Sequence, residues 1–239
     1  MKSTPSRSRP VLAIGECLID LIATEGRDLL AAETCAIREG GAPANVAVAL
    51  ARLGVPSAFC GVVGDDPFGV RLRASLVREG VDVSSLRVTR EAETTLALAW
   101  TDAKGDGHFR LLRHADRLLS PVDVEGAGIA GVGAIVVGSV ALSASPSREA
   151  IERAVALAAE SNVPVVFDLN LRPSLWPDLA TSAAACDPVL RAATVVKLSL
   201  DDARGVLGAT RPEDVFAALS DTDPLAIVVT DGPRGVWFK

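Results

Sequence analysis

Residues 134–140 read Ala-Ile-Val-Val-Gly-Ser-Val, and this apolar run is the first of four that set the fold. The other three, all rich in Val or Ile, are Val163–Phe167, Thr194–Leu198 and Ala226–Thr230. Such runs are typical of strands buried on both faces. Helical stretches separate them, at Ser147–Ser161, at Leu179–Ala193 and in shorter pieces after Ser199 and Pro212. This alternation predicts right-handed crossovers and a parallel sheet covered by helices.

The first half of the chain predicts further parts of that layer and a small second sheet. Its core elements are expected to be strands at Val11–Leu18 and Ser57–Val63, a helix buried nearly all round at Pro43–Leu53, and a helix at Pro67–Glu79. Shorter strands are expected at Leu18–Thr24, Thr34–Arg38, Thr94–Trp100 and His108–Leu112, with a hairpin turn at 102–107. No helix lies within either pair of short strands, so we expect a β-sheet projecting from one domain.

Composition excludes several classes of protein. The chain has 239 residues, of which 49% are hydrophobic, so it is neither disordered nor fibrous. Its 24 Lys and Arg residues are scattered among 30 Asp and Glu residues, which gives a net charge of −6 and argues against nucleic-acid binding. No apolar stretch approaches the roughly 18 residues that a membrane span needs.

The first ten residues and the cysteines favour a cytoplasmic protein. Residues 1–10 carry positive charge without a signal-length apolar run behind them, and we expect them to form a flexible tail. The cysteines Cys17, Cys35, Cys60 and Cys186 form no CxxC pair, so free and mostly buried thiols are expected.

Two segments in the first half are candidates for ligand binding. Gly40 and Gly41 allow a sharp turn and a close approach to a ligand, and Asn45 follows near the start of an apolar helix. Asp20 lies in the apolar stretch Leu18–Ile22, where a carboxylate is costly unless it is paired or at an edge. Asn45 is equally consistent with a structural loop, and Asp20 with a turn or a cap.

A second group of polar residues follows the predicted parallel strands, where ligands of such sheets bind. It comprises Asn170 and Arg172, then Lys197, Ser199, Asp201 and Asp202, and finally Thr230, Gly232 and Gly235. Arg172 suits a phosphate or a carboxylate, and the last glycine-bearing turn can offer N–H groups to a phosphate. Helix capping by the two aspartates and a plain turn at the end are the alternative interpretations.

Taken together, these segments resemble the ribokinase-like (PfkB) carbohydrate kinase family. The family's Gly-Gly turn, small residue, Asn and spaced Gly pair are matched by residues 40–45, Gly54 and Gly64. Residues 61–69 are similar to the next block. Within the family, the similarity to bacterial fructokinases is greatest in three segments: residues 15–20, residues 167–172 with Leu175-Trp176, and residues 197–199. The 2-keto-3-deoxygluconate kinases are close relatives, and the resemblance runs from about Val11 to Lys239.

The resemblance implies a three-layer, Rossmann-type α/β fold with a mostly parallel sheet. Residues 11–239 would form the kinase domain, with lid strands from about 18–38 and 94–112 that also join two copies into a homodimer. The implied reaction is ATP-dependent phosphorylation of a sugar hydroxyl, with Mg²⁺. The implied sugar ligands are Asp20, Gly40, Gly41, Asn45 and Arg113. ATP and its phosphates would contact Asn170, Arg172, Lys197, Ser199, Thr230, Gly232 and Gly235, with Asp202 reaching magnesium through water. Asp202 stands where Glu is usual, and Ser199 where many members have Asn.

Family members also carry a Gly-Ala-Gly-Asp motif nearer the C-terminus, whose amides form an anion hole and whose Asp is the general base. No such sequence follows Gly235, so the expectation is a kinase domain incomplete at its C-terminus, with no catalytic residue before Lys239. Two alternatives stay open. One is a 2-keto-3-deoxygluconate kinase, in which Arg113 pairs with the substrate carboxylate. The other is a sugar-binding homologue without catalysis.

Overall fold

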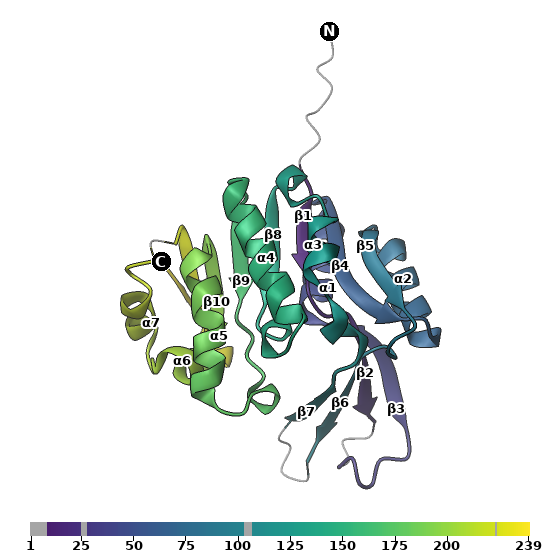
Figure 1. Cartoon of the computed structure of the whole chain (residues 1–239). Coiled ribbons are helices and arrows are strands. Elements are labelled where there is room, and N and C mark those ends of the chain that lie inside the picture. Colours follow the sequence, from purple (N-terminus) through teal and green to yellow (C-terminus); the bar gives the residue numbers. More distant parts are fainter. Residues whose placement is uncertain (1–8, 25–27, 103–106, 223) are drawn as a thin grey trace.

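The main layer of the protein is an eight-stranded sheet, in the order β12-β11-β10-β9-β8-β1-β4-β5 (Figure 1). The computed structural model describes residues 9–24, 28–102, 107–222 and 224–239. The strands of this sheet are β1 (Val11–Ile14), β4 (Ser57–Gly64), β5 (Asp82–Thr89), β8 (Ala134–Gly138), β9 (Val165–Asp168), β10 (Val195–Ser199), β11 (Ala226–Thr230) and β12 (Val236–Phe238). All neighbours are parallel except β11 and β12, so the carboxyl ends of seven strands meet at one edge.

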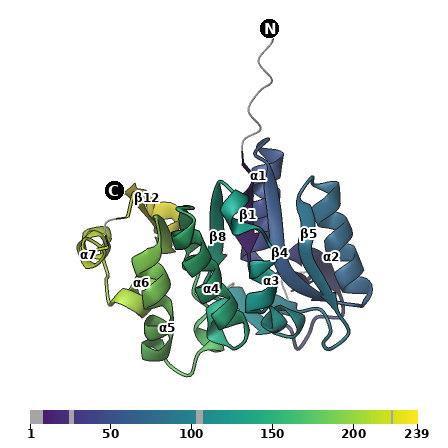
Figure 2. The same ribbon diagram turned by 45° about the horizontal axis from the view of Figure 1, so that its top comes forward.

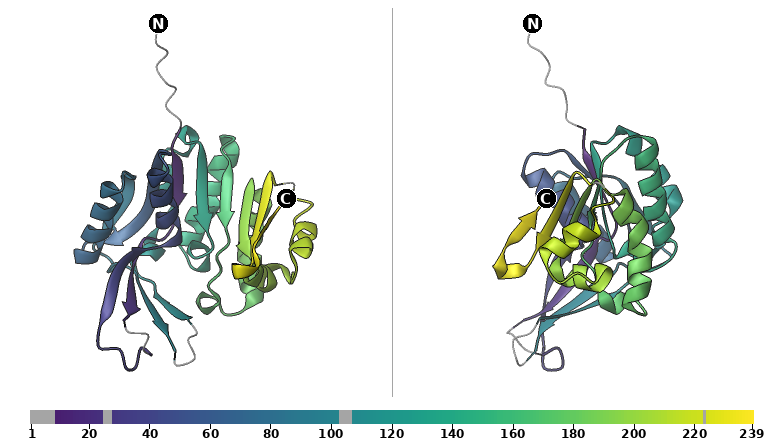
Figure 3. Two further views of the ribbon diagram at one scale, coloured as in Figure 1. Left: turned by 180° about the vertical axis from the view of Figure 1, so that it is seen from behind. Right: turned by 90° about the vertical axis from the view of Figure 1, so that its left-hand side faces the viewer.

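Helices cover the two faces of this sheet unequally (Figures 2 and 3). One face carries α1 (Ala42–Arg52) and α2 (Pro67–Arg78) over its β1, β4 and β5 end. The other is covered by α3 (Pro121–Glu125), α4 (Ser147–Glu160), α5 (Leu179–Ala192) and α6 (Leu200–Leu207), and α7 (Pro212–Ala218) packs against β11. Seen from behind, no helix of the described chain lies over β9, β10 and β11 on the α1 side (Figure 3). The 3₁₀ turns are Ala115–Leu118, Ile129–Gly131, Ala141–Ser143, Pro173–Leu175 and Gly232–Arg234.

A second sheet of four strands projects from the carboxyl edge and is called the lid here (Figure 1). Its order is β3 (Cys35–Gly40), β2 (Leu18–Ala23), β6 (Leu96–Thr101) and β7 (Gly107–Leu112). The predicted projecting sheet is therefore confirmed, with strand ends that differ by at most two residues. Residues 103–106 of the predicted hairpin turn lie outside the described residues, as do residues 1–8 of the predicted tail.

The hydrophobic core lies between the sheet and its two helical layers. The larger cluster joins β8, β9 and β10 to α4 and α5, and its fully buried side chains include Ile135, Phe167 and Ile151. A smaller cluster joins β1 and β4 to α1 and α2, around Phe59 and Leu72. Strands β1, β4 and β8 meet helices on both faces, as the apolar runs predict. For β9, β10 and β11 the expectation of burial on both faces was wrong, because no helix of the described chain covers them on the α1 side.

Three expectations about the first half were wrong. Val11–Leu18 is not one strand, because Gly15, with φ +147°, breaks it between β1 and β2. The helix α1 is not buried all round, since Asn45 and Ala49 are exposed on the side away from the sheet. The edge strand β5 was not expected, because its polar residues Ser84, Ser85 and Arg87 interrupt the run of apolar residues that is typical of a buried strand.

The cysteines and the helix lengths agree with the sequence analysis. All four cysteines are free, with Cys17, Cys60 and Cys186 buried and Cys35 exposed. Across the part of the chain that the structure describes, every helix is too short or too polar to span a bilayer.

Candidate active site

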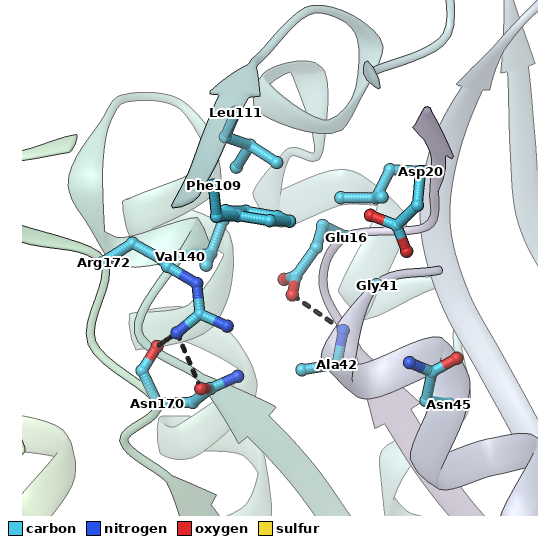
Figure 4. A pocket seen from close by; sticks show the side chains of 11 residues that line it. Glu16, Asp20, Gly41, Ala42, Asn45, Phe109, Leu111, Val140, Asn170 and Arg172 are labelled. Carbon is cyan, nitrogen blue, oxygen red and sulfur yellow. Dashed lines mark hydrogen bonds between the residues drawn. The ribbon is translucent and has the colours of Figure 1, made fainter. Parts of the chain in front are cut away.

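A pocket of about 170 Å³ opens where the lid meets the carboxyl edge of the main sheet (Figure 4). Its lining comes from the β1–β2 corner, the start of α1, the lid strand β7 and the loops after β8 and β9. The lining residues are Glu16, Leu18, Asp20, Gly41, Ala42, Asn45, Phe109, Leu111, Val140, Asn170 and Arg172. An apolar cavity of about 150 Å³ holds benzene, so this pocket suits a ligand with about six carbon atoms.

The Gly40-Gly41 turn brings the backbone close to the pocket because neither position has room for a side chain. A Cβ on Gly40 would lie 2.1 Å from Asp20 Oδ2. A Cβ on Gly41 would lie 2.4 Å from the Glu16 carbonyl oxygen, and Gly41 has φ +104°, a conformation that favours glycine. Gly41 caps α1, and Pro43 suits the first turn of that helix. The turn therefore holds the Asp20 carboxylate next to the first residues of α1.

Asp20 and Asn45 face the pocket from the lid and from α1 (Figure 4). Asp20 is half-buried, and burial raises the pKa of its carboxyl, although the charge of Arg172 acts in the opposite direction. The expectation that the helix over Pro43–Leu53 is buried nearly all round was wrong at Asn45. Its side chain is exposed, and among the described residues it has no hydrogen-bond partner. Its amide is therefore available to a ligand.

Glu16 is the most buried charged group of the pocket, with 4% of its surface exposed. Its Oε1 accepts a hydrogen bond of 3.0 Å from the Ala42 N–H, the first of α1. Its Oε2 is also buried and meets no hydrogen-bond partner within the described residues. Burial raises the pKa of Glu16 to about 7, with a smaller increase from the charge of Asp116.

The lid forms the upper wall of the pocket through small residues on one face. Asp20 pairs with Ala97, which pairs with Leu111, and Ala99 pairs with Phe109. Paired residues on neighbouring strands point to the same face, so the two alanines leave room between Asp20 and the large side chains of β7. Phe109 therefore reaches across the pocket toward the main sheet (Figure 4).

Arg172 meets Phe109 from the opposite wall, with Cζ 5.3 Å from the ring centroid, a cation–π contact. Its Nη1 donates to Asn170 Oδ1 at 2.8 Å and to the Leu171 carbonyl at 3.1 Å. Asn170 has φ +37° and so turns its side chain back to Arg172. Among the described residues no acceptor meets Arg172 Nε or Nη2, which leaves both donors for a ligand.

Arg113, predicted to reach the sugar, lies outside the pocket lining. Its side chain is 6% exposed, and Nε donates to Asp116 at 2.6 Å. Its Nη1 donates to the Val140 carbonyl and to Ser143 Oγ. Because Val140 lines the pocket, this arrangement links Arg113 to the wall of the site, and direct contact with a ligand stays a prediction.

Part of the second predicted group, from Lys197 to Gly235 but without Asp201 and Asp202, lies on the sheet face that helices leave uncovered. Lys197 pairs in register with Asp168, and its Nζ lies 3.0 Å from Asp168 Oδ1. Ser199 pairs with Thr230, so both side chains share that face. Gly232 follows Thr230 in the turn Gly232–Arg234, and Gly235, with φ +123°, closes it. The structure therefore brings a cation, two hydroxyls and a glycine turn to one end of the sheet.

Asp202 is engaged as a helix cap. Its Oδ2 accepts from the Ser199 N–H at 2.9 Å and its Oδ1 from the Leu171 N–H at 2.8 Å. Ser199 Oγ in turn accepts from the Asp202 N–H, so the pair forms a capping box at the start of α6. In the described ranges no three His, Cys, Asp or Glu side chains come together as metal ligands. Asp202 is therefore engaged as a cap in this structure, and its contact with magnesium through water stays a prediction.

Sequence reasoning missed Glu16 and the apolar wall formed by Phe109, Leu111 and Val140. A signal for Glu16 was available, because it follows a buried strand at the carboxyl edge, as Asn170 does. No comparable signal marks Phe109, because alternation shows that a strand has two faces without showing which one meets the pocket.

A parallel α/β sheet with a lid and a polar pocket between them, at the carboxyl ends of the strands, is typical of α/β proteins that bind a small molecule. Residues 8–239 match the model of the pfkB family carbohydrate kinases, and the chain belongs to that family. Fructokinase-1 of Oryza sativa subsp. japonica is 36% identical over 236 residues, which cover 97% of this chain and 73% of that protein.

Solved structures of fructokinases share the fold of this chain. The ATP-bound fructokinase of Xylella fastidiosa superposes with a TM-score of 0.84 at 32% identity, over 96% of this chain and 70% of that one. The fructokinase of Vibrio cholerae O395 bound to fructose, ADP and calcium gives a TM-score of 0.84 at 30% identity, over 98% of this chain and 74% of that one. The predicted fold class and family resemblance are confirmed.

Proposed function

We propose that the pocket binds a neutral sugar and that the protein transfers the γ-phosphoryl group of ATP to one of its hydroxyls, with fructose as the leading candidate. The observation that carries this proposal is the meeting of Asp20, Asn45 and the Gly41 turn in one pocket below the lid. The fructose-bound and ATP-bound relatives support it.

The sugar side rests on complementary hydrogen-bonding groups. The Asp20 carboxylate can accept two hydroxyl protons, and the Asn45 amide can both donate and accept. Phe109 and Leu111 offer an apolar wall that excludes water from the reacting hydroxyl, where phosphoryl transfer depends on positioning and charge.

The ATP side rests on the uncovered sheet face. Lys197 provides a point charge for phosphate oxygens, Ser199 and Thr230 provide hydroxyls, and the Gly232–Gly235 turn provides backbone N–H groups. Arg172, between the two groups, keeps two donors for a phosphate. In this proposal ATP supplies the phosphoryl group.

The test is calorimetric binding of fructose, ribose and 2-keto-3-deoxygluconate, together with sugar-dependent ADP release. Asp20→Ala and Asn45→Ala are each expected to weaken sugar binding at least tenfold, whereas Asp221→Ala, on the exposed surface, leaves it unchanged. Unchanged binding in both pocket variants would contradict the placement of the site.

Two alternatives have distinct outcomes in the same experiment. A sugar-acid kinase is favoured by the Arg172 donors in the pocket, and it would bind 2-keto-3-deoxygluconate more tightly than fructose. A non-catalytic sugar-binding homologue would bind sugar without releasing ADP.

A further inference from the structure

Glu16 lies in the wall of the pocket and has one oxygen without a hydrogen-bond partner among the described residues. Oε1 is satisfied by the Ala42 N–H, while Oε2 is buried with no hydrogen-bond partner among the described residues. A buried polar atom without a partner costs about 1–3 kcal/mol, so such atoms are rare unless a ligand or water meets them. Because the side chain lines the pocket, the ligand itself is the natural partner.

The position of Oε2 follows from the backbone and not from a flexible side chain. Glu16 follows the break at Gly15, whose Cβ would lie 2.8 Å from Pro43 Cγ, so the corner packs directly on the start of α1. The Ala42 N–H then holds the carboxyl in one orientation. Figure 4 shows the carboxyl of Glu16 directed at Ala42, between the side chains of Asp20 and Val140.

The charges around Glu16 restrict what can approach Oε2. Asp116 and Arg113 lie beyond the pocket wall and are paired with each other, and Asp20 stands on the pocket side. A sugar hydroxyl can donate to an ionised carboxylate or accept from a neutral carboxyl, so it fits either form of Glu16. A substrate carboxylate would be repelled by Asp20 and by the ionised form of Glu16 on this side of the pocket, while Arg172 lies on the opposite wall.

We propose that Glu16 is a specificity-determining residue whose Oε2 contacts a hydroxyl of the bound sugar and favours neutral polyhydroxy sugars over sugar acids. The inference rests on the proposed sugar-binding function and adds to it a contact and a substrate class. Glu16 thus joins the helix start, through Oε1, to the ligand, through Oε2.

The experiment compares the wild-type chain with Glu16→Gln, which keeps an acceptor for the Ala42 N–H and replaces Oε2 with an amide group. Glu79→Gln, at a partly buried residue paired with the exposed Arg52, makes the same chemical change outside the pocket lining. Calorimetry gives the Kd of fructose, of each monodeoxyfructose and of 2-keto-3-deoxygluconate, with thermal unfolding measured in parallel.

We expect Glu16→Gln to weaken fructose binding about 10- to 100-fold. One monodeoxyfructose, lacking the hydroxyl that meets Oε2, should bind wild type and Glu16→Gln equally well. The preference for fructose over the sugar acid should fall at least tenfold. A merely structural role would weaken all analogues by the same factor, so that uniform loss overturns the proposal, as does fructose binding within twofold of wild type.

If Glu16→Gln does not fold, Glu16→Met serves in the same comparison, because it keeps the side-chain length without an acidic group. Wild type that binds no sugar at all would overturn the proposed function and this inference together. Wild type that binds fructose while the variants show no hydroxyl-specific loss would overturn the inference alone.

Discussion

At the scale of single residues, the pocket depends on positions where a side chain is missing. Gly40 makes room for the Asp20 carboxylate, and Gly41 makes room for the Glu16 carbonyl. The sequence shows the two glycines but not what they avoid, since the partners lie about 20 residues earlier in the chain. The turn and the acidic residues therefore form one structural unit.

The first prediction concerns Gly41→Ala. The new Cβ would lie 2.4 Å from the Glu16 carbonyl and would adopt φ +104°, so both a clash and strain are expected. We expect the free energy of unfolding to fall by about 2–4 kcal/mol and sugar binding to be lost. Urea unfolding and calorimetry measure the two effects.

Gly80→Ala is the matched control, because Gly80 has φ +84° with open space around it. Its free energy of unfolding should fall only by the backbone strain, about 1 kcal/mol, and its sugar binding should be retained. Equal destabilisation by the two variants would contradict the importance of the Gly41–Glu16 contact.

The second prediction concerns pH and Glu16. In the folded protein burial raises the pKa of Glu16 to about 7, from 4.5 for an exposed side chain. Between these values the native state holds a proton that the unfolded state has lost, so this contribution to stability is complete below about pH 4.5 and decreases as pH rises to about 7. The decrease amounts to about 3 kcal/mol at most.

The difference in unfolding free energy between Glu16→Gln and wild type, measured by urea unfolding from pH 5 to pH 8, isolates this residue. Glu16→Gln should gain stability relative to wild type as pH rises. A difference that stays constant over this range would show that Glu16 is ionised throughout.

At the scale of elements, one aspartate joins α2 to the base of the lid. Asp66 caps α2, and its Oδ1 accepts from the Phe68 and Gly69 N–H groups at 2.8 and 2.9 Å. Its Oδ2 accepts from the Thr94 N–H, just before β6. Burial raises the pKa of Asp66, but these hydrogen bonds outweigh it and hold the pKa below its usual value.

The third prediction is that Asp66→Ala lowers the free energy of unfolding by about 1–2 kcal/mol, as loss of a helix cap does. Since the folded pKa is depressed, the ionised Asp66 stabilises the protein above about pH 4, and this contribution is lost as pH falls through the folded value. Asp178→Ala, a cap of α5 without a contact to the lid, should cost a similar amount. Hydrogen exchange in β6 should rise for Asp66→Ala alone.

The contact between Phe109 and Arg172 is the other link between elements. It joins β7 of the lid to the loop after β9, across the pocket. The fourth prediction is that Phe109→Leu, which keeps an apolar side chain without a π face, weakens sugar binding about threefold to tenfold.

Calorimetry measures the effect of Phe109→Leu. Arg172→Lys should cause a similar loss, because lysine lacks the planar group that stacks on the ring. Full affinity in both variants would show that the wall does not depend on this contact.

At the scale of the whole molecule, the lid leaves apolar surface open. Ile22 on β2 is 39% exposed and Phe109 on β7 is 40% exposed, on a sheet covered by no helix of the described chain on its pocket side. We propose that two copies associate through their lids, which would bury these side chains.

The fifth prediction is a concentration-dependent dimer in sedimentation equilibrium. Ile22→Arg should raise the dimer dissociation constant at least tenfold, since a charge would be buried. Val70→Arg, which places the same charge on the exposed side of α2, is the control. A monomer at every concentration would contradict the proposed association.

Much of the architecture could be predicted because it depends on local patterns. The runs at β8 to β11 are mostly Val, Ile and other apolar residues, and the intervening helices have clear boundaries, so the parallel sheet follows. The polar edge strand β5 and the half-exposed α1 were misjudged, because composition does not tell which neighbours cover an element.

The sequence by itself determined the class of fold, the position of the candidate residues at the carboxyl ends of strands and, through its motifs, the kinase family. Only the tertiary structure decided how those residues are used. It separated the pocket group from the Lys197 group, engaged Asp202 as a cap and buried Arg113 behind the wall. It also brought Glu16 and Phe109, 93 residues apart, to the same pocket. The physical reason is that motifs record local backbone requirements, whereas burial and partnership depend on which distant segments pack together.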